Sequence, residues 1–418
     1  MYGQLVVHLY VKLDFVLKED PLHNAIPEPR PLSATPGGQL PLDDVVGRDQ
    51  DIARLWAMLA TSSVRLNEPR RLGKTSVLNK LAAEPPPDWL CVKVSLQGVN
   101  STTEMAESLL ARVYQLQRLP KRALRALKSV MAGATATVEG VSFTLAPAFR
   151  SAPVAALQAA LGEVSEALQE RGDRLLLACD EVPDMLLSIA ENEGPTAAAD
   201  VLAVLRRFRD AEADSAVRWL LTGSVGMHHV LRKIGAGDDL VNDLDNFHLG
   251  PFDVAWSKWL GESLLLGAGL EYDTDTPAEL ARITGGIPYL VHLIVAYARD
   301  DQEITRMAAG DTDKVFERAV ADLDASQQST HLLTRLAPYY GHGTLAAEWI
   351  LDRTAESPVT RSGLQAAART SRFPLPSDAE LRDLLVLLSL DHYLTKDPAG
   401  AYSWRYPALQ RIWKIRRS

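Results

Sequence analysis

Residues 65–81 read "RLNEPRRLGKTSVLNKL", and this stretch decides the fold. It follows a short apolar run, "SVRL" (63–66), that is a candidate strand. After "GKTS" (73–76) the apolar residues recur at helical spacing, until three consecutive prolines at 85–87 end the pattern. The stretch is therefore predicted to form a strand, a loop and a helix in that order.

The loop carries the residue types that hold a phosphate group. Gly73 lets backbone N–H groups approach an anion, Lys74 can reach phosphate oxygens, and the Thr75 hydroxyl can bind Mg²⁺ at a helix N-terminus. Such loops usually open with glycine, but here Glu68 stands in that place, followed by Pro69. Because proline restricts the residue before it and fixes its own φ, the pair can set the start of the loop by rigidity. The predicted nucleotide-binding residues of the loop are Pro69, Arg70, Arg71, Leu72, Gly73, Lys74, Thr75 and Ser76.

A second apolar run, "RLLLACDE" (174–181), ends in two carboxylates. In an open parallel sheet ligands bind at the carboxyl edge, so this pair is expected near the loop. Successive strand residues point to opposite sides, which lets the two side chains take different roles. Asp180 is predicted to hold Mg²⁺ together with Thr75, and Glu181 to polarise the attacking water. The alternative interpretation is an ordinary polar strand end.

A third apolar run, "VRWLLTGS" (217–224), supplies further polar candidates at its end. Thr222 and Ser224 could sense the terminal phosphate of a nucleotide. Thr222 is accordingly grouped with Lys74 and Glu181 as a predicted catalytic residue. The alternative is a glycine-containing turn that only ends the strand.

Apolar strands alternate with amphipathic helices through this part of the chain. That alternation is typical of an α/β fold with a parallel sheet covered on both faces. The insert between the strands at 89–96 and 174–181 is predicted to form one helix near 103–131, followed by a hairpin over "TATVEGVSFTLAP" (135–147). The predicted strands of the sheet are 63–66, 89–96, 174–181, 217–224 and 246–252.

Four segments are expected along the chain. Residues 1–41 are expected to be an N-terminal extension and linker, in which an apolar start that could form a short edge strand or a loosely packed extension precedes an extended lead-in rich in proline and glycine (18–44). Residues 42–252 are expected to form the α/β core. Residues 253–324 are predicted to be a helical lid, interrupted by "TGGIPYL" (284–290). Residues 325–418 combine helices with two short alternating runs, which predicts a winged helix.

The composition fits a globular chain of two or three domains, with 418 residues, 47% hydrophobic and 23% charged. The net charge of −9 argues against a surface that is basic overall. Cys91 and Cys179 lie in apolar strands and are expected to be buried free thiols, which fits a reducing cytoplasm. No run of 18 apolar residues occurs and no signal cleavage site follows the first 20 residues, so a cytoplasmic protein without membrane contact is expected.

Several motifs occur together in a fixed order: "VVGRD" (45–49), "EPRRLGKTS" (68–76), "LLLACDE" (175–181), "LTGSVGMHHVLR" (221–232), "TGGIPYL" (284–290) and the terminal winged-helix pattern. In this order they resemble the archaeal-type ATPases, relatives of the STAND and origin-recognition branches of the AAA+ class. The resemblance covers residues 42–418. It implies a P-loop NTPase with Walker A and Walker B motifs that binds ATP or ADP with Mg²⁺ and hydrolyses ATP.

The same resemblance implies roles for residues outside the loop. Val46, Gly47 and Arg48 would lie near the adenine, and Gly286 and Pro288 would bring the lid against the nucleotide. The glycines of this lid motif permit a tight turn and its proline a rigid helix start, so a plain turn is the alternative.

Three further groups of residues are weaker candidates. In STAND proteins a winged-helix histidine can touch the phosphate, and His392 is the nearest match, although a strand histidine is the alternative. His228 and His229 have no metal-ligand companion at useful spacing and are expected to be structural. An arginine run on the helix before the third apolar run could act on a neighbouring subunit or form a solvated face: Arg206, Arg207 and Arg209.

The favoured function is an ATP-dependent molecular switch of slow turnover, acting on a protein partner or through self-association. A DNA-binding initiator or regulator is the alternative, because the tail "RYPALQRIWKIRRS" (405–418) is basic. A module that binds nucleotide without hydrolysing it is the third possibility.

Overall fold

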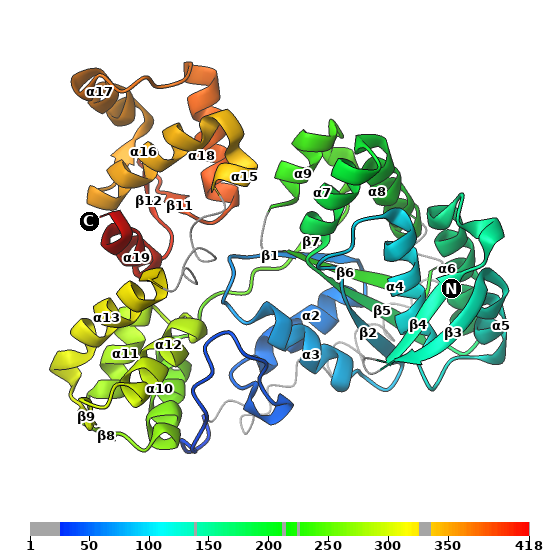
Figure 1. Ribbon diagram of the computed structural model, residues 1–418, viewed down its shortest axis with the longest axis horizontal. Helices are drawn as coiled ribbons and strands as arrows, with labels where there is room; N and C mark the ends of the chain where they lie inside the picture. Colours follow the sequence, from blue (N-terminus) through cyan, green and yellow to red (C-terminus); the bar gives the residue numbers. More distant parts are fainter. Residues whose placement is uncertain (1–25, 138–139, 211–214, 224–225, 326–335, 418) are drawn as a thin grey trace, which may run out of the picture. The chain divides into compact units, whose positions relative to one another are not determined.

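The computed structural model describes residues 26–137, 140–210, 215–223, 226–325 and 336–417. These residues form two compact units. The first contains residues 26–38, 46–54 and 251–319, and the second contains the described parts of 39–45, 55–250 and 320–417 (Figure 1).

A five-stranded parallel sheet forms the centre of the second unit, with strand order β2-β5-β6-β1-β7. All residues of β6 are buried, as are all of β5 except Arg174, which is the burial expected of a sheet covered on both faces. Strands form at four of the five predicted stretches, whereas the fifth prediction, 246–252, is wrong in its bounds because it shares only Asn246 with a two-residue strand. Their bounds are β1 (Val64–Asn67), β2 (Trp89–Ser95), β5 (Arg174–Asp180), β6 (Val217–Gly223) and β7 (Asp245–Asn246).

Helices cover this sheet. In Figure 1, α3 lies on one side of it and α7, α8 and α9 lie on the other. The helix predicted after the "GKTS" loop is confirmed as α3, whose Val77, Leu78 and Leu81 are fully buried. The helices that precede or follow the strands are α3 (Lys74–Ala83), α4 (Thr102–Tyr114), α6 (Pro153–Gln169), α7 (Val182–Asn192), α8 (Pro195–Asp210) and α9 (Met227–Ile234).

The insert between β2 and β5 differs from its prediction in one respect. The single helix expected near 103–131 is wrong, because α4 ends at Tyr114 and α5 (Lys121–Val130) begins after Pro120. Proline has no N–H to donate and disfavours helical conformation before it, so it separates the two helices. The predicted hairpin is confirmed as β3 (Met131–Thr137) and β4 (Gly140–Leu145).

The C-terminal segment of the second unit combines helices with a small antiparallel sheet of order β10-β12-β11. The indole N–H of Trp404, on β12, donates to the backbone carbonyl of Leu351 and so joins this sheet to α16. The predicted hairpin is present as β11 and β12. The elements are α15 (Leu336–Tyr340), α16 (Thr344–Glu356), β10 (Val359–Thr360), α17 (Arg361–Ser371), α18 (Asp378–Leu390), β11 (Leu394–Lys396), β12 (Ala401–Trp404) and α19 (Pro407–Arg417).

The first unit is mainly helical, and the extended lead-in packs within it. The Leu32 N–H donates to the Ser263 carbonyl at 2.9 Å, and the Thr35 N–H donates to His292 Nδ1 at 3.2 Å. No helix or strand occurs in residues 26–40, as the composition of this stretch predicts. The elements that lie or begin in this unit are α2 (Asp49–Leu59), α10 (Val254–Ala268), β8 (Glu271–Tyr272), α11 (Thr276–Thr284), α12 (Pro288–Asp300), β9 (Arg306–Met307) and α13 (Thr312–Ala325).

The structure bears on membrane spans and on the two cysteines. Within the described ranges, no helix is both long and apolar enough to cross a membrane. Cys91 and Cys179 are buried free thiols, as predicted, and burial raises the pKa of Cys91 to about 12.

Candidate functional site

The loop between β1 and α3 contains two residues with left-handed backbone conformation. Gly73 lies in the left-handed region at φ 92° and precedes the first residue of α3, while Arg71 has φ 80°. Glu68 is not among the residues with positive φ. The position that usually holds glycine therefore needs no glycine here, whereas the rigid start expected from Glu68 and Pro69 stays a prediction.

Lys74 is held inside this loop. Its ammonium group donates to the backbone carbonyls of Glu68, at 2.6 Å, and Pro69, at 2.9 Å. Burial lowers the pKa of Lys74 to about 8, although the carboxylates of Glu181 and Asp180 favour the charged form. Backbone acceptors thus fix the position of the lysine charge inside the loop.

Asp180 is the centre of the site. Its Oδ2 accepts a hydrogen bond from the Thr75 hydroxyl at 3.1 Å, and its Oδ1 accepts one from the Thr222 hydroxyl at 2.6 Å. The backbone N–H of Glu181 also donates to Oδ1, at 3.1 Å. Because β6 pairs with both β1 and β5, residues predicted separately from three stretches of sequence converge at one sheet edge.

Glu181 differs from its prediction. The alternation expected of a strand does not reach it, because β5 ends at Asp180 and Glu181 adopts a left-handed conformation, φ 59°, before α7. A left-handed conformation costs a non-glycine residue roughly 1–2 kcal/mol, and such strain often marks a functional position. The Glu181 carboxylate lies 3.7 Å from Arg70 Nη2, and Asp184 lies 4.0 Å from the same nitrogen. Glu181 therefore faces the loop because the chain turns there.

The buried carboxylate of Glu68 is a feature that the sequence interpretation missed. Its Oε1 lies 3.1 Å from His248 Nδ1, and its Oε2 accepts a hydrogen bond from the Tyr406 hydroxyl at 3.4 Å. His392 Nε2 lies 3.7 Å from the same carboxylate and 2.7 Å from the carbonyl oxygen of Asn67. Burial lowers the pKa of His392. The C-terminal segment thus contacts the first residues of the loop between β1 and α3.

A second contact from the C-terminal segment was also missed. The Tyr339 hydroxyl donates to Asp184 Oδ1 at 2.9 Å, next to the Arg70 and Glu181 pair. No local pattern in the sequence could have found either contact, because the partners are separated by 155 residues in one case and 338 in the other.

The remaining candidate residues from the sequence lie in different surroundings. Ser224 lies outside the described residues. Arg209 is buried and forms a bidentate pair with Asp243, and Arg206 pairs with Asp239, so both are engaged within their own unit. Arg207 is exposed. His228 and His229 do have a companion in space, Asp391, although none is near in sequence.

The residues that the resemblance assigns to adenine and lid contacts lie in the first unit. Gly47 has φ 69°, and a Cβ there would come within 2.9 Å of the Trp256 ring. Arg48 is buried, with its guanidinium 2.9 Å from Asp51 and 4.4 Å from the centre of the Phe252 ring. Val46, beside them, is half-buried. Their contact with a nucleotide stays a prediction.

The lid motif forms the turn that its residues predict. Gly285 and Gly286 have φ 57° and 74°, and Pro288 is the first residue of α12. A Cβ at Gly286 would come within 2.1 Å of the Phe252 carbonyl oxygen, so only glycine fits there. A role of Gly286 and Pro288 at a nucleotide stays a prediction as well.

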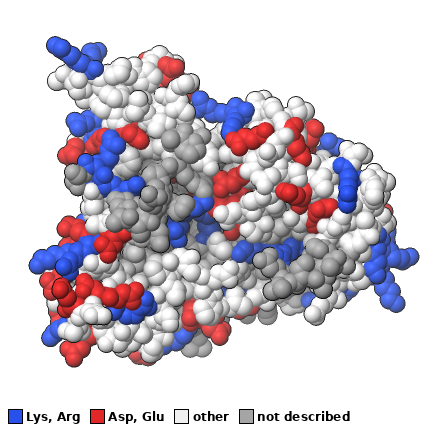
Figure 2. All heavy atoms as spheres, in the orientation of Figure 1, with Lys and Arg blue, Asp and Glu red and all other residues white. Residues whose placement is uncertain are grey.

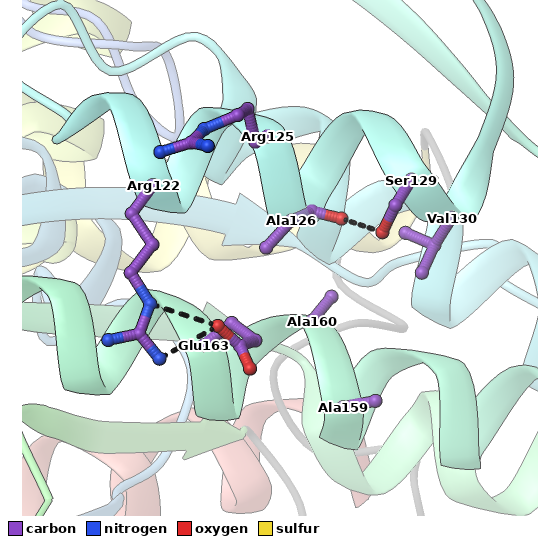
Figure 3. Close-up of a pocket in the computed structure, with 8 residues that line it drawn as sticks. All are labelled: Arg122, Arg125, Ala126, Ser129, Val130, Ala159, Ala160 and Glu163. Carbon is purple, nitrogen blue, oxygen red and sulfur yellow. Dashed lines mark hydrogen bonds and ion pairs between the residues drawn. The ribbon is translucent and has the colours of Figure 1, made fainter.

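A surface pocket lies between α5 and α6, away from Asp180 in the sequence (Figure 3). Its Arg122 donates hydrogen bonds to Glu163 and Glu170 and pairs with Glu166, so its charge is balanced within the chain. On the face shown in Figure 2, basic and acidic side chains are interspersed. Neither feature resembles the convergent, buried arrangement around Asp180.

Comparisons with known proteins identify the fold. No protein-family model and no curated protein sequence matches the chain. The structure is similar to that of the Walker-type ATPase PABY2304 of Pyrococcus abyssi, with TM-score 0.59 and 18% identity over 94% of this chain and 99% of that one. It is also similar to the ORC2 protein of Aeropyrum pernix in its ADPNP–ADP complexes, with TM-score 0.50 and 13% identity over 95% and 96% of the two chains. The chain therefore has the α/β fold with a parallel central sheet that P-loop NTPases share.

Proposed function

We propose that this protein is a molecular switch that binds ATP and hydrolyses it slowly. One observation carries the proposal: Asp180 holds the hydroxyl groups of Thr75 and Thr222 at the loop that encloses Lys74. The fold likeness supports it, since one similar structure is a Walker-type ATPase and the other contains ADPNP and ADP.

The oxygen atoms around Asp180 fit a magnesium ion. Mg²⁺ takes oxygen ligands at about 2.0–2.1 Å in octahedral geometry, which places neighbouring ligand oxygens about 3 Å apart. Thr75 Oγ1 and Asp180 Oδ2 are 3.1 Å apart. Thr75 and Asp180 would therefore hold the ion, directly or through water. When bound, Mg²⁺ would neutralise charge on the oxygens of the terminal phosphates.

The remaining residues have complementary roles. Lys74 would exchange its two carbonyl acceptors for phosphate oxygens, and backbone N–H groups of the loop and of the first turn of α3 would hold the others. Glu181, turned towards the loop, would orient the attacking water and accept its proton. Thr222 would keep the Asp180 carboxylate in place and sense the terminal phosphate.

The switch part of the proposal rests on the C-terminal segment, which we interpret as a winged helix. His392 and Tyr406 contact Glu68, and Tyr339 contacts Asp184, so two sides of the phosphate site touch this segment. A loop that rearranges when nucleotide binds would change both contacts, and the segment would respond to nucleotide state. Residues 42–252, 253–324 and 325–418 would then act as ATPase core, lid and responding domain.

The test is ATP turnover by the purified protein. Lys74→Ala and Glu181→Gln should each lower the rate by about 100-fold or more, since each removes a group that acts on transition-state charge or on the water. Matched controls are Lys121→Ala and Glu84→Gln, which change exposed residues of the same types. Equal turnover in all five proteins would show that the site is wrongly assigned.

A second measurement separates a cycling ATPase from a module that keeps its nucleotide. The purified protein would be denatured and the released nucleotide identified. Tightly retained ADP together with negligible turnover would favour the interaction module. Light scattering with ATP and with ADP would show whether nucleotide drives self-association or leaves a separate protein partner to receive the signal.

A DNA-binding initiator or regulator is the second candidate, because α19 is basic and one similar structure is an ORC2 protein. Arg417, however, pairs with Asp352 and Glu348 inside the segment, which reduces the charge available to DNA. Binding to duplex DNA that weakens steeply with salt would support this candidate. Absence of binding at low salt would remove it.

A further inference from the structure

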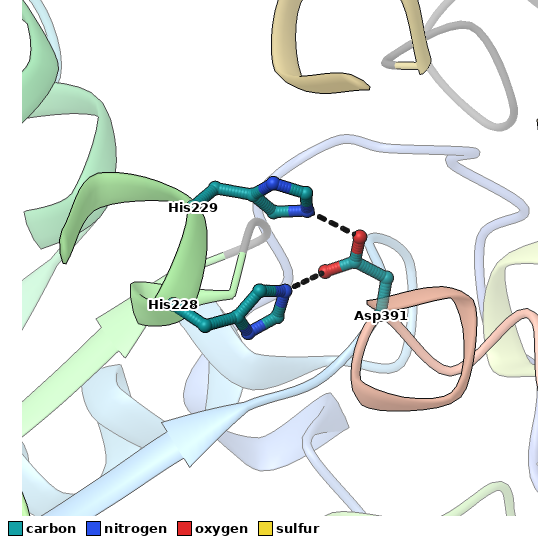
Figure 4. Close-up of side chains that lie close together, drawn as sticks. All are labelled: His228, His229 and Asp391. Carbon is teal, nitrogen blue, oxygen red and sulfur yellow. Dashed lines mark hydrogen bonds and ion pairs between the residues drawn. The ribbon is translucent and has the colours of Figure 1, made fainter. Parts of the chain in front are cut away.

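A second buried carboxylate, that of Asp391, lies beside two imidazole groups. Asp391 follows α18, and its two oxygens face the imidazoles of His228 and His229, in the first turn of α9 (Figure 4). His228 Nε2 lies 3.2 Å from Oδ1, and His229 Nε2 lies 2.6 Å from Oδ2. The two nitrogens and one carboxylate oxygen all lie within 4.8 Å of one another.

The burial of these atoms makes their pairing significant. The side chains of His229 and Asp391 are 4% and 11% exposed. His228 Nε2 and Asp391 Oδ1 are buried, and neither has a hydrogen-bond partner with acceptable geometry among the described residues. Buried polar groups without partners are costly, and each requires an explanation. A cation between them would satisfy both atoms at once.

We propose that His228, His229 and Asp391 bind one divalent transition-metal ion, with Zn²⁺ as the expected occupant. Two imidazoles and a carboxylate form a donor set that suits Zn²⁺, whereas Mg²⁺ and Ca²⁺ prefer oxygen ligands alone. The site is separate from the one at Asp180 and does not depend on nucleotide.

The distances are compatible with such an ion. Zn–N and Zn–O bonds of about 2.0–2.2 Å place tetrahedral ligand atoms roughly 3.4 Å apart. The 3.2 Å distance between His228 Nε2 and Asp391 Oδ1 fits this value. The 2.6 Å distance between His229 Nε2 and Asp391 Oδ2 would have to increase by about 0.8 Å. His228 also lines a surface hollow with His248, His392 and Arg405, which gives an ion a route in.

Neighbouring residues already orient the three ligands. The Tyr340 hydroxyl donates to Asp391 Oδ2 at 2.6 Å, and the Tyr340 ring lies 5.0 Å from that of His229. A Cβ at Gly226 would come within 1.9 Å of the His228 ring, so the glycine backbone packs directly against this imidazole. Support of this kind fixes ligand orientation in metal sites. Bound metal would join α9 of the sheet-containing core to the end of α18 in the C-terminal segment.

The experiment uses the full chain without a histidine tag, stripped with a chelator and titrated with Zn²⁺ by calorimetry. One Zn²⁺ per chain is expected, together with a higher thermal unfolding temperature. Co²⁺ should bind at the same stoichiometry and give visible absorption bands that report nitrogen and oxygen ligands. Failure of the wild-type chain to bind Zn²⁺ stoichiometrically would overturn the proposal.

Variants assign the ligands. His228→Ala and Asp391→Asn should weaken Zn²⁺ binding by more than about 100-fold, since even loss of an outer-shell partner costs 10- to 100-fold. His342→Ala is the matched control, because it removes an exposed histidine from the C-terminal segment. Circular dichroism would verify that each variant folds. Stoichiometric Zn²⁺ binding that survives in both ligand variants, or that His342→Ala abolishes, would place the ion elsewhere and contradict the proposal.

Discussion

Asp180 and Asp391 are two buried carboxylates, each at the end of a secondary-structure element and each with polar side chains beside both oxygens. Asp180 ends a strand and accepts hydrogen bonds from the hydroxyls of Thr75 and Thr222. Asp391 follows a helix and faces the imidazoles of His228 and His229. Oxygen neighbours suit Mg²⁺ and a triphosphate, whereas nitrogen neighbours suit a softer metal. The partners, more than the carboxylate itself, thus determine what each site can bind.

Replacing Asp180 or Asp391 with alanine should have the largest effects and so tests this comparison best. Asp391→Ala removes the buried carboxylate that pairs with two histidines and accepts the Tyr340 hydroxyl, so the free energy of unfolding should fall by about 3–5 kcal/mol. Asp180→Ala should instead lower ATP turnover by about 10²–10³-fold, since it removes the carboxylate that holds the Thr75 and Thr222 hydroxyls and that we propose binds Mg²⁺. Thermal unfolding and steady-state hydrolysis of both variants measure the two effects.

The control for this pair is Asp200→Ala, which changes an exposed aspartate of α8. It should leave both the unfolding temperature and the turnover close to those of the wild type. If Asp180→Ala destabilised the fold as strongly as Asp391→Ala while turnover persisted, the division between the two carboxylates would be wrong.

The substitution Gly226→Ala tests the Asp391 site without changing the Asp180 site. In Gly226→Ala the new methyl group would overlap the His228 ring, and such overpacking typically costs about 1–3 kcal/mol. The unfolding temperature should fall and Zn²⁺ binding should weaken. Gly250→Ala is the matched control, because a Cβ there meets no atom within 4 Å. Equal behaviour of the two variants would mean that His228 moves freely.

Thr222 tests the Asp180 site with the smallest expected effect. Thr222→Val keeps the shape but removes one hydrogen bond to Asp180, which retains those from Thr75 and from the Glu181 N–H. Turnover should fall roughly tenfold, equivalent to about 1.4 kcal/mol. Thr222→Ser restores the hydroxyl and should recover most of the rate. A serine variant as slow as the valine variant would argue that the methyl group matters instead.

The sequence predicts the Asp180 site because its parts are local patterns. A loop between strand and helix, and an apolar run ending in Asp180, each have a recognisable form. The rule that parallel strands share a carboxyl edge then brings them together. What such patterns miss is the exact end of the strand, which placed Glu181 in a left-handed turn.

The Asp391 site and the surroundings of Glu68 could not be predicted in this way. Asp391 is 162 residues from His229, and no spacing rule connects a helix end to a distant helix start. The sequence shows that Glu68 stands where such loops usually have glycine, and the following proline explains how the backbone tolerates a non-glycine residue there. Neither observation gives the direction of the carboxylate, which depends on where His248, His392 and Tyr406 pack.

The lead-in of the first unit has a consequence for folding during synthesis. The Arg30 N–H donates to Ser263 Oγ, a partner made 233 residues later. At about 5–20 residues per second, the lead-in waits roughly 12–47 s for that partner. Residues 55–250, which lie between these two partners in sequence and hold the whole parallel sheet, are synthesised before Ser263. The core can therefore fold as one continuous segment, while the first unit closes around its own early residues only afterwards.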